Sequence, residues 1–141
     1  MSNVTGIKAS LLAKLNAMQS LKAAYGWETS NPSGNYPFAT LTLRAGEGEF
    51  RSTFHNLRRE RFRVRIYQEQ NRPQGQGPAA AETISTNVLD EFLTAVDMDT
   101  TLSGTCKYVK PVRWDASYQD RDVDTRILEI DIDAFEITSA K

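Results

Sequence analysis

The sequence of 141 residues contains one cysteine, Cys106, and one histidine, His55. A single cysteine excludes a disulfide framework, which suits a reducing compartment or a fold that needs no bridges. One histidine and one cysteine also cannot build a typical structural zinc site, which needs about four such ligands. The sequence therefore gives no reason to expect a metal or another cofactor.

Long apolar runs are missing as well. No run approaches the roughly 18 residues needed to cross a bilayer, and residues 1–10 lack the apolar segment of a secretory signal. We therefore expect no membrane partner. The chain has 17 basic and 18 acidic residues and a formal net charge of −1. Domains that hold duplex nucleic acid are usually strongly basic, so phosphate binding would have to come from a local patch.

Apolar residues recur at three- and four-residue steps in two segments, which predicts two amphipathic helices. The first begins near Val4 and continues to Tyr25, with Gly26 as the terminating glycine. The second begins at Pro78 and ends near residue 97. Between them, residues 37–70 predict a three-stranded meander with turns at residues 45–48 and 55–57. Gaps this short join antiparallel neighbours.

Two further strands are expected after the second helix. Pro111 puts the first, residues 105–114, at an edge, a bulge or a strand end. Residues 115–122 form a turn or a longer hairpin tip. The second strand comprises residues 126–137. Its apolar residues alternate through Ile132, but Phe135 and Ile137 fall on the other face, which a bulge near Ala134 would explain. The segment of residues 71–78 is rich in proline and glycine and predicts a mobile loop.

These elements predict one α+β domain spanning residues 1–141. Its mainly antiparallel sheet has four to five strands, with both helices packed on one face. The order along the chain is α-β-β-β-α-β-β.

Groups that could perform catalysis are sparse. No glycine-rich phosphate loop and no nucleophile elbow is present. Cys106 lies in an alternating strand pattern, where a cysteine is more often a small buried residue than a nucleophile. Glu129, Asp131 and Asp133 follow one strand face at two-residue steps of about 6.6 Å, too widely spaced to surround one ion. We therefore expect no enzyme.

The most informative pattern is electrostatic. Arg61, Arg63 and Arg65 share one strand face, as Glu129, Asp131 and Asp133 do on another strand. If the strands are neighbours, cross-strand charge pairs form, each contributing roughly 0.2–1 kcal/mol. If they lie apart, each subunit has a positive and a negative side, which suits a head-to-tail ring. Two alternatives remain: a merely solvated face, and a nucleic-acid-binding module that uses Arg58, Arg59, Arg61, Arg63 and Arg65.

Four stretches together resemble the tail terminator, or tail completion, proteins of tailed bacteriophages, which are related in fold to head–tail joining proteins. These are YPFATLTL, FRVRIYQEQ, AETISTNVLDEFLTAVDMDTTLSGT and RILEIDIDAFEI, within residues 36–137. The resemblance implies a non-enzymatic virion protein that forms a hexameric ring at the head–tail junction. Such a ring caps the tail tube, stops its polymerisation and docks the head. Before assembly the protein would be in the host cytoplasm.

The same resemblance implies the partners. They are further copies of the chain, the tail tube protein and the head–tail connector or adaptor proteins, and DNA passes through the lumen without being read. The candidate subunit interface comprises Arg61, Arg63, Arg65, Glu129, Asp131 and Asp133. A candidate loop contacting the tube or a neighbour comprises Asn71, Arg72, Gln74 and Gln76.

Overall fold

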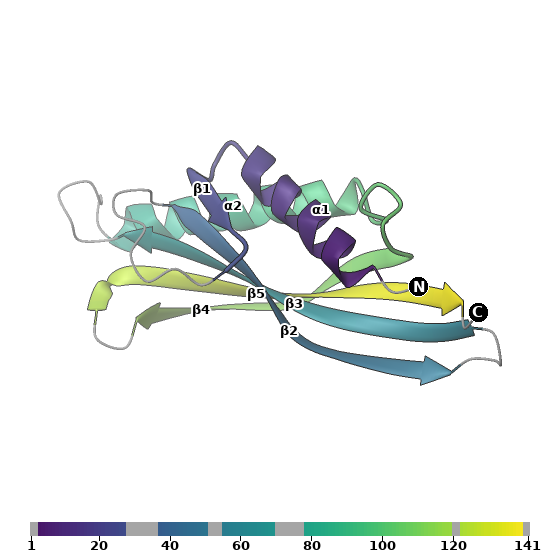
Figure 1. Cartoon of the computed structure of the whole chain (residues 1–141). Coiled ribbons are helices and arrows are strands. Elements are labelled where there is room, and N and C mark those ends of the chain that lie inside the picture. The colour runs from purple at the N-terminus through teal and green to yellow at the C-terminus, as the bar shows by residue number, and fades with distance from the viewer. Residues whose placement is uncertain (1–2, 28–36, 51–54, 70–77, 120–121, 140–141) are drawn as a thin grey trace.

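The computed structural model describes residues 3–27, 37–50, 55–69, 78–119 and 122–139 (Figure 1). Two helices and five strands follow one another in the predicted order, which is thereby confirmed. Their bounds are α1 (Val4–Ala17), β1 (Ala23–Tyr25), β2 (Phe38–Phe50), β3 (His55–Glu69), α2 (Pro78–Asp97), β4 (Tyr108–Gln119) and β5 (Asp122–Ser139).

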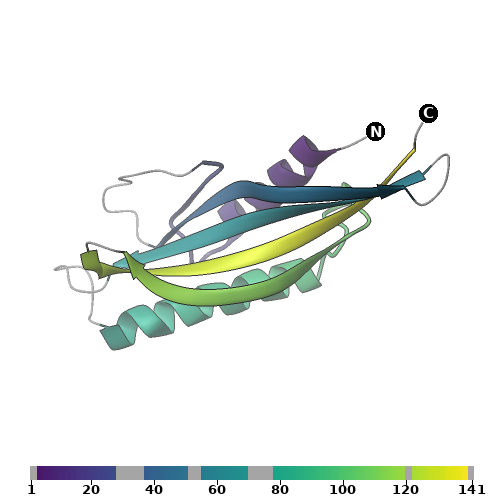
Figure 2. The same ribbon diagram turned by 90° about the horizontal axis from the view of Figure 1, so that it is seen from below.

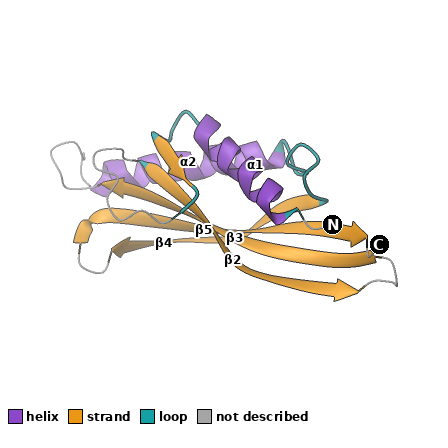
Figure 3. Cartoon of the chain, in the orientation of Figure 1, coloured by secondary structure: helices purple, strands orange, loops and turns teal. Residues whose placement is uncertain are grey.

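The strands form a single five-stranded sheet in the order β1-β2-β3-β5-β4. β1 pairs with β2 in parallel, and the other three pairs are antiparallel. Both helices lie on the same face of this sheet (Figures 1 and 3). The opposite face, seen in Figure 2, has no helix over it, and we call it the open face. The predicted α+β class and the placement of both helices are therefore confirmed.

The predicted turn at residues 45–48 is wrong, because β2 continues through it. Gly46 and Gly48 lie in the strand, opposite Glu60 and Arg58 of β3. The register shifts once, between Leu43 and Ala45, so a bulge replaces the turn. The 15-residue β3 offers backbone partners along all of β2, and this pairing overrides the weak strand preference of glycine. Residues 37–70 thus contain two strands of the sheet, and the additional strand is the short β1.

The first helix is shorter than predicted. It ends at Ala17, and Met18 is already extended, with ψ at 131°. Lys22 N–H then donates to the carbonyl of Pro37 at 2.8 Å, where the chain enters the sheet. Leu21 and Tyr25 keep the helical spacing in the sequence, but neither lies in the helix. Leu21 is a buried residue of the loop after α1, and Tyr25 belongs to β1. The start of α2 at Pro78 agrees with the prediction.

The predicted bulge near Ala134 is also wrong. β5 pairs with β3 without a register shift from Thr125 to Ser139. Phe135 therefore lies on the open face, and Glu136 lies on the helix-covered face. The prediction for Pro111 is confirmed, since β4 is the edge strand and its register shifts between Pro111 and Arg113.

The core lies between the helices and the covered face of the sheet. Its fully buried side chains follow the predicted periods of helix and strand. They include Ile7, Leu11 and Leu15 from α1, Val88, Phe92 and Val96 from α2, Phe62, Val64 and Ile66 from β3, and Ile130 and Ile132 from β5. This packing fixes β3 and β5 as central strands, and the charged side chains between their core residues consequently face the other way.

Candidate interaction surface on the open face

The two charged stripes lie directly opposite each other on the open face. The register of β3 and β5 pairs Arg61 with Asp133, Arg63 with Asp131 and Arg65 with Glu129. The three Nε–carboxylate distances are 2.8, 2.9 and 2.7 Å in that order. In the first two pairs a terminal nitrogen also donates to the second carboxylate oxygen, at 3.1 and 3.4 Å. Of the alternatives open from the sequence, the structure has the cross-strand pairs within one chain.

The carboxylates of the first two pairs are buried. Asp133 is 2% exposed and Asp131 is 5% exposed, because the arginine side chains lie across them. Burial by itself would raise the pKa of Asp131, but the hydrogen bond from Arg63 and the nearby guanidinium charges hold it below its usual value. The pKa of Arg63 is raised in turn, chiefly by the same hydrogen bond. Both partners therefore stay ionised near neutral pH.

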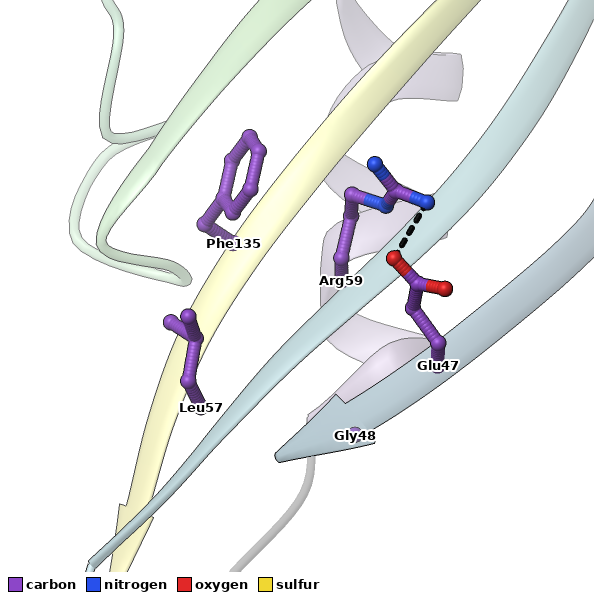
Figure 4. A pocket seen from close by; sticks show the side chains of 5 residues that line it. All are labelled: Glu47, Gly48, Leu57, Arg59 and Phe135. Atoms are coloured by element: carbon purple, nitrogen blue, oxygen red, sulfur yellow. Dashed lines mark ion pairs between the residues drawn. The ribbon is translucent and has the colours of Figure 1, made fainter. Parts of the chain in front are cut away.

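Next to the charge pairs is a shallow pocket of about 350 Å³. Figure 4 shows its lining residues, Glu47, Gly48, Leu57, Arg59 and Phe135. Arg59 forms an ion pair with Glu47 and also approaches Asp133, at 3.9 Å. The pocket thus has an apolar side, formed by Leu57 and Phe135, and a charged side.

Apolar surface continues beyond this pocket. Phe135 stacks on Tyr108 of β4, with ring centroids 4.5 Å apart. Tyr108 is 44% exposed and Ile137 is 46% exposed. Sequence reasoning missed this patch because it placed a bulge at Ala134. The signal in the sequence was the position of Phe135 and Ile137, which share the parity of Asp131 and Asp133.

A second unpredicted feature is a pair of buried carboxylates on the helix-covered face. Glu60 is 7% exposed and Glu136 is 5% exposed. Oε1 of Glu136 accepts a hydrogen bond from the backbone N–H of Asn3 at 2.7 Å, just before α1 begins. Burial is the main cause that raises the pKa of Glu60 to about 7, followed by the charge of Glu136. The sequence signal was the position of Glu60, two residues before the core residue Phe62.

The described residues offer little for catalysis or metal binding. No group of three or more His, Cys, Asp or Glu side chains in this part of the chain is placed to hold a metal ion. Cys106 is half-buried, and burial raises the pKa of its thiol to about 11, which disfavours the reactive thiolate. His55 is the first residue of β3.

Some expectations concern parts of the chain without described structure. The candidate contact residues Asn71, Arg72, Gln74 and Gln76 lie outside the described residues, as does the whole segment expected as a loop except Pro78. In the described ranges, no helix is long and apolar enough to cross a membrane.

Comparison with known proteins adds no family to this picture. The sequence matches no protein-family model, and a search of curated proteins gave no significant match.

Proposed function

We propose that the protein is a tail terminator of a tailed bacteriophage, a structural protein whose copies form a ring. The ring caps the tail tube and joins it to the head or its connector, with no catalytic role. The proposal starts from the resemblance over residues 36–137. Its family implies an α+β subunit, and the fold class of the chain agrees with that.

The observation that supports an assembly role best is the open face of the sheet. Arg61, Arg63 and Arg65 already have carboxylate partners within the chain, so these three arginines present little unpaired charge to an approaching protein. Beside the pairs lies exposed apolar surface at Tyr108 and Ile137. Surfaces that combine exposed aromatic and aliphatic side chains with polar groups are typical of protein contacts. β2, β3 and β5 also extend beyond the helices at the end where both termini lie, which gives the subunit a projecting arm (Figure 1).

The same observation disfavours the nucleic-acid-binding alternative. Binding to a duplex depends on cationic side chains that release counterions from phosphates. Here Arg61, Arg63 and Arg65 each have a carboxylate within 3 Å. Contact with phosphates would have to break these pairs and leave buried carboxylates behind.

Native mass spectrometry and light scattering of the purified protein test the ring directly. We expect a closed oligomer, six subunits by the resemblance, visible as rings in negative stain. Ile137→Asp should shift the population toward monomers, because it places a charge in the exposed apolar patch. Asn87→Asp is the matched control, since Asn87 is exposed on α2, on the opposite side of the sheet. A protein that stays monomeric at every concentration and ionic strength, even with tail tubes added, would refute the proposal.

A binding titration separates the two functions. The ring proposal expects no specific duplex binding by the isolated protein. Binding at low salt that weakens steeply with added salt would favour the nucleic-acid module instead.

A further inference from the structure

The sheet has two edges that its own strands leave open. β1 pairs only with Phe38–Thr40, so within the described ranges no strand covers β2 from Leu41 to Phe50. At the other edge, β5 is the only described strand that pairs with β4. Residues 43–48 of β2 and 113–116 of β4 are all exposed. Unpaired edges of this length are templates for a further strand.

The register shows at which edge residues the backbone N–H and C=O groups point away from the sheet. Lys107 N–H donates to the carbonyl of Phe135 at 2.7 Å, so the main chain of Phe135 is turned toward β4. In antiparallel pairs this direction alternates from one residue to the next. We applied this alternation from Phe135 along β5 to β4, and through β3 to β2. The backbone N–H and C=O groups of Leu43 in β2 and of Trp114 in β4 then point away from the sheet. The same alternation turns Val109 outward, and Val109 N–H indeed donates to Thr100 outside the sheet, at 2.7 Å.

We propose that β2 of one copy pairs antiparallel with β4 of the next copy, with Leu43 opposite Trp114. These side chains are 50% and 47% exposed, and both lie on the covered side of the sheet, because their partners Phe62 and Ile130 belong to the core. Pairing them would bury two large apolar groups against each other.

This register makes two further features match. The bulge between Leu43 and Ala45 falls beside the bulge between Pro111 and Arg113. Counting on past both bulges places Lys110 opposite Glu47 on the open face, where it would join Arg59 as a second cation beside that carboxylate. Opposite charges at directly facing positions stabilise a strand pair.

The directions of the strands suit a ring. β2 and β4 run in opposite directions in one sheet, so two copies side by side in the same orientation bring them together antiparallel. The contact joins two different edges, which is the heterologous kind that closes into a ring when the rotation between copies divides a full turn. Pairing is confined to a short segment, because Pro111 has no N–H and that of Val109 is already bonded. The inference rests on the proposed ring and names its subunit contact.

A disulfide test follows from the register. Leu43→Cys and Trp114→Cys are introduced together in a Cys106→Ser background, which removes the only native thiol. Directly hydrogen-bonded antiparallel positions lie about 5.5 Å apart between Cα atoms, within disulfide range. Oxidation should give a series of covalent oligomers that ends at the ring size. Leu43→Cys alone is the control, and covalent dimers of that variant would overturn the proposal by revealing β2–β2 pairing.

Charge reversal gives an independent readout. Glu47→Lys and Lys110→Glu should each raise the concentration needed for half-assembly roughly tenfold, and the double reversal should recover part of it, since the Glu47–Arg59 pair within the chain stays broken. Both sites are exposed, and circular dichroism checks that each variant folds. Rings that persist without cross-links or charge effects would overturn this contact and leave the proposed function standing. A chain that never assembles would overturn both.

Discussion

The stability of the protein should fall as pH rises from about 4.5 to about 7, because of Glu60. This carboxyl is 7% exposed, and its Oε2 atom has no hydrogen-bond partner among the described residues. Burial raises its pKa most, and the charge of Glu136 and the hydrogen bond between the two groups add to the rise. Arg58 opposes it, and the nearby Cys106 is neutral at these pH values. Glu60 therefore folds in its protonated form.

The sign follows from proton linkage. Between pH 4.5 and 7 an unfolded chain has lost the Glu60 proton, whereas the folded chain keeps it. The folded state then binds more protons, so the free energy of unfolding decreases with rising pH. The stabilisation is fully present below pH 4.5 and is lost through pH 7. Each pKa unit corresponds to about 1.4 kcal/mol, so the total change is about 3 kcal/mol. This change in stability is a property of the interacting Glu60–Glu136 pair, because the two carboxyls titrate together.

Glu60→Gln removes the titration while keeping the shape of the neutral acid. We expect the variant to match the wild type near pH 4.5 and to exceed it by about 3 kcal/mol at pH 8. Urea unfolding at several pH values, followed by circular dichroism, measures this difference. Asp90→Asn is the matched control, since Asp90 is exposed on α2.

Equal pH dependence in wild type and Glu60→Gln would refute the reasoning. It would mean that Glu60 ionises in the folded state without cost, for example because water reaches Oε2. A loss of pH dependence in Asp90→Asn as well would attribute the effect to net charge rather than to burial.

Three other predictions concern the open face, the core and the thiol. Arg63→Ala should lower the free energy of unfolding by about 2 kcal/mol in urea, because it leaves Asp131 buried without its main partner. The double variant with Asp131→Ala should lose less than the two single variants lose together. Strict additivity would contradict the pairing. Phe92→Ala should cost about 3–5 kcal/mol because Phe92 is fully buried, whereas Asn87→Ala should stay within about 0.5 kcal/mol. Cys106 should react with a thiol reagent at pH 8 roughly a hundredfold more slowly than in the unfolded chain, since its pKa is about 11; equal rates would contradict its burial.

Local sequence patterns predicted elements well where periodicity and packing agree. The stripe from Ala81 to Val96 predicted α2, and Pro78 marked its first residue. The stripe of α1 predicted a longer helix than exists, because Leu21 and Tyr25 keep the spacing while the chain joins the sheet. The glycines in residues 45–48 predicted a turn, but pairing with β3 along its whole length outweighed their local preference.

The candidate site was only partly predictable for a related reason. Alternation with core residues is enough to place the arginines of β3 and the acids of β5 on the sheet face opposite the core. The buried pair of Glu60 and Glu136 and the patch around Phe135 were missed, since the apparent parity change was attributed to a bulge. Both features depend on which strand lies beside β5 and on what covers each face there.

The sequence by itself determined the α+β class, the order of the elements and the sidedness of the charged stripes. These properties follow from side-chain periods of two and 3.6 residues, which act over short distances along the chain. Only the tertiary structure decided that β5 lies between β3 and β4, and that Arg63 faces Asp131 in the same chain. It also decided that, in the described ranges, no strand lies beside β2 past Thr40 or on the outer side of β4. Strand order and register are set by pairing and core packing between segments distant in sequence, so no single segment contains that information.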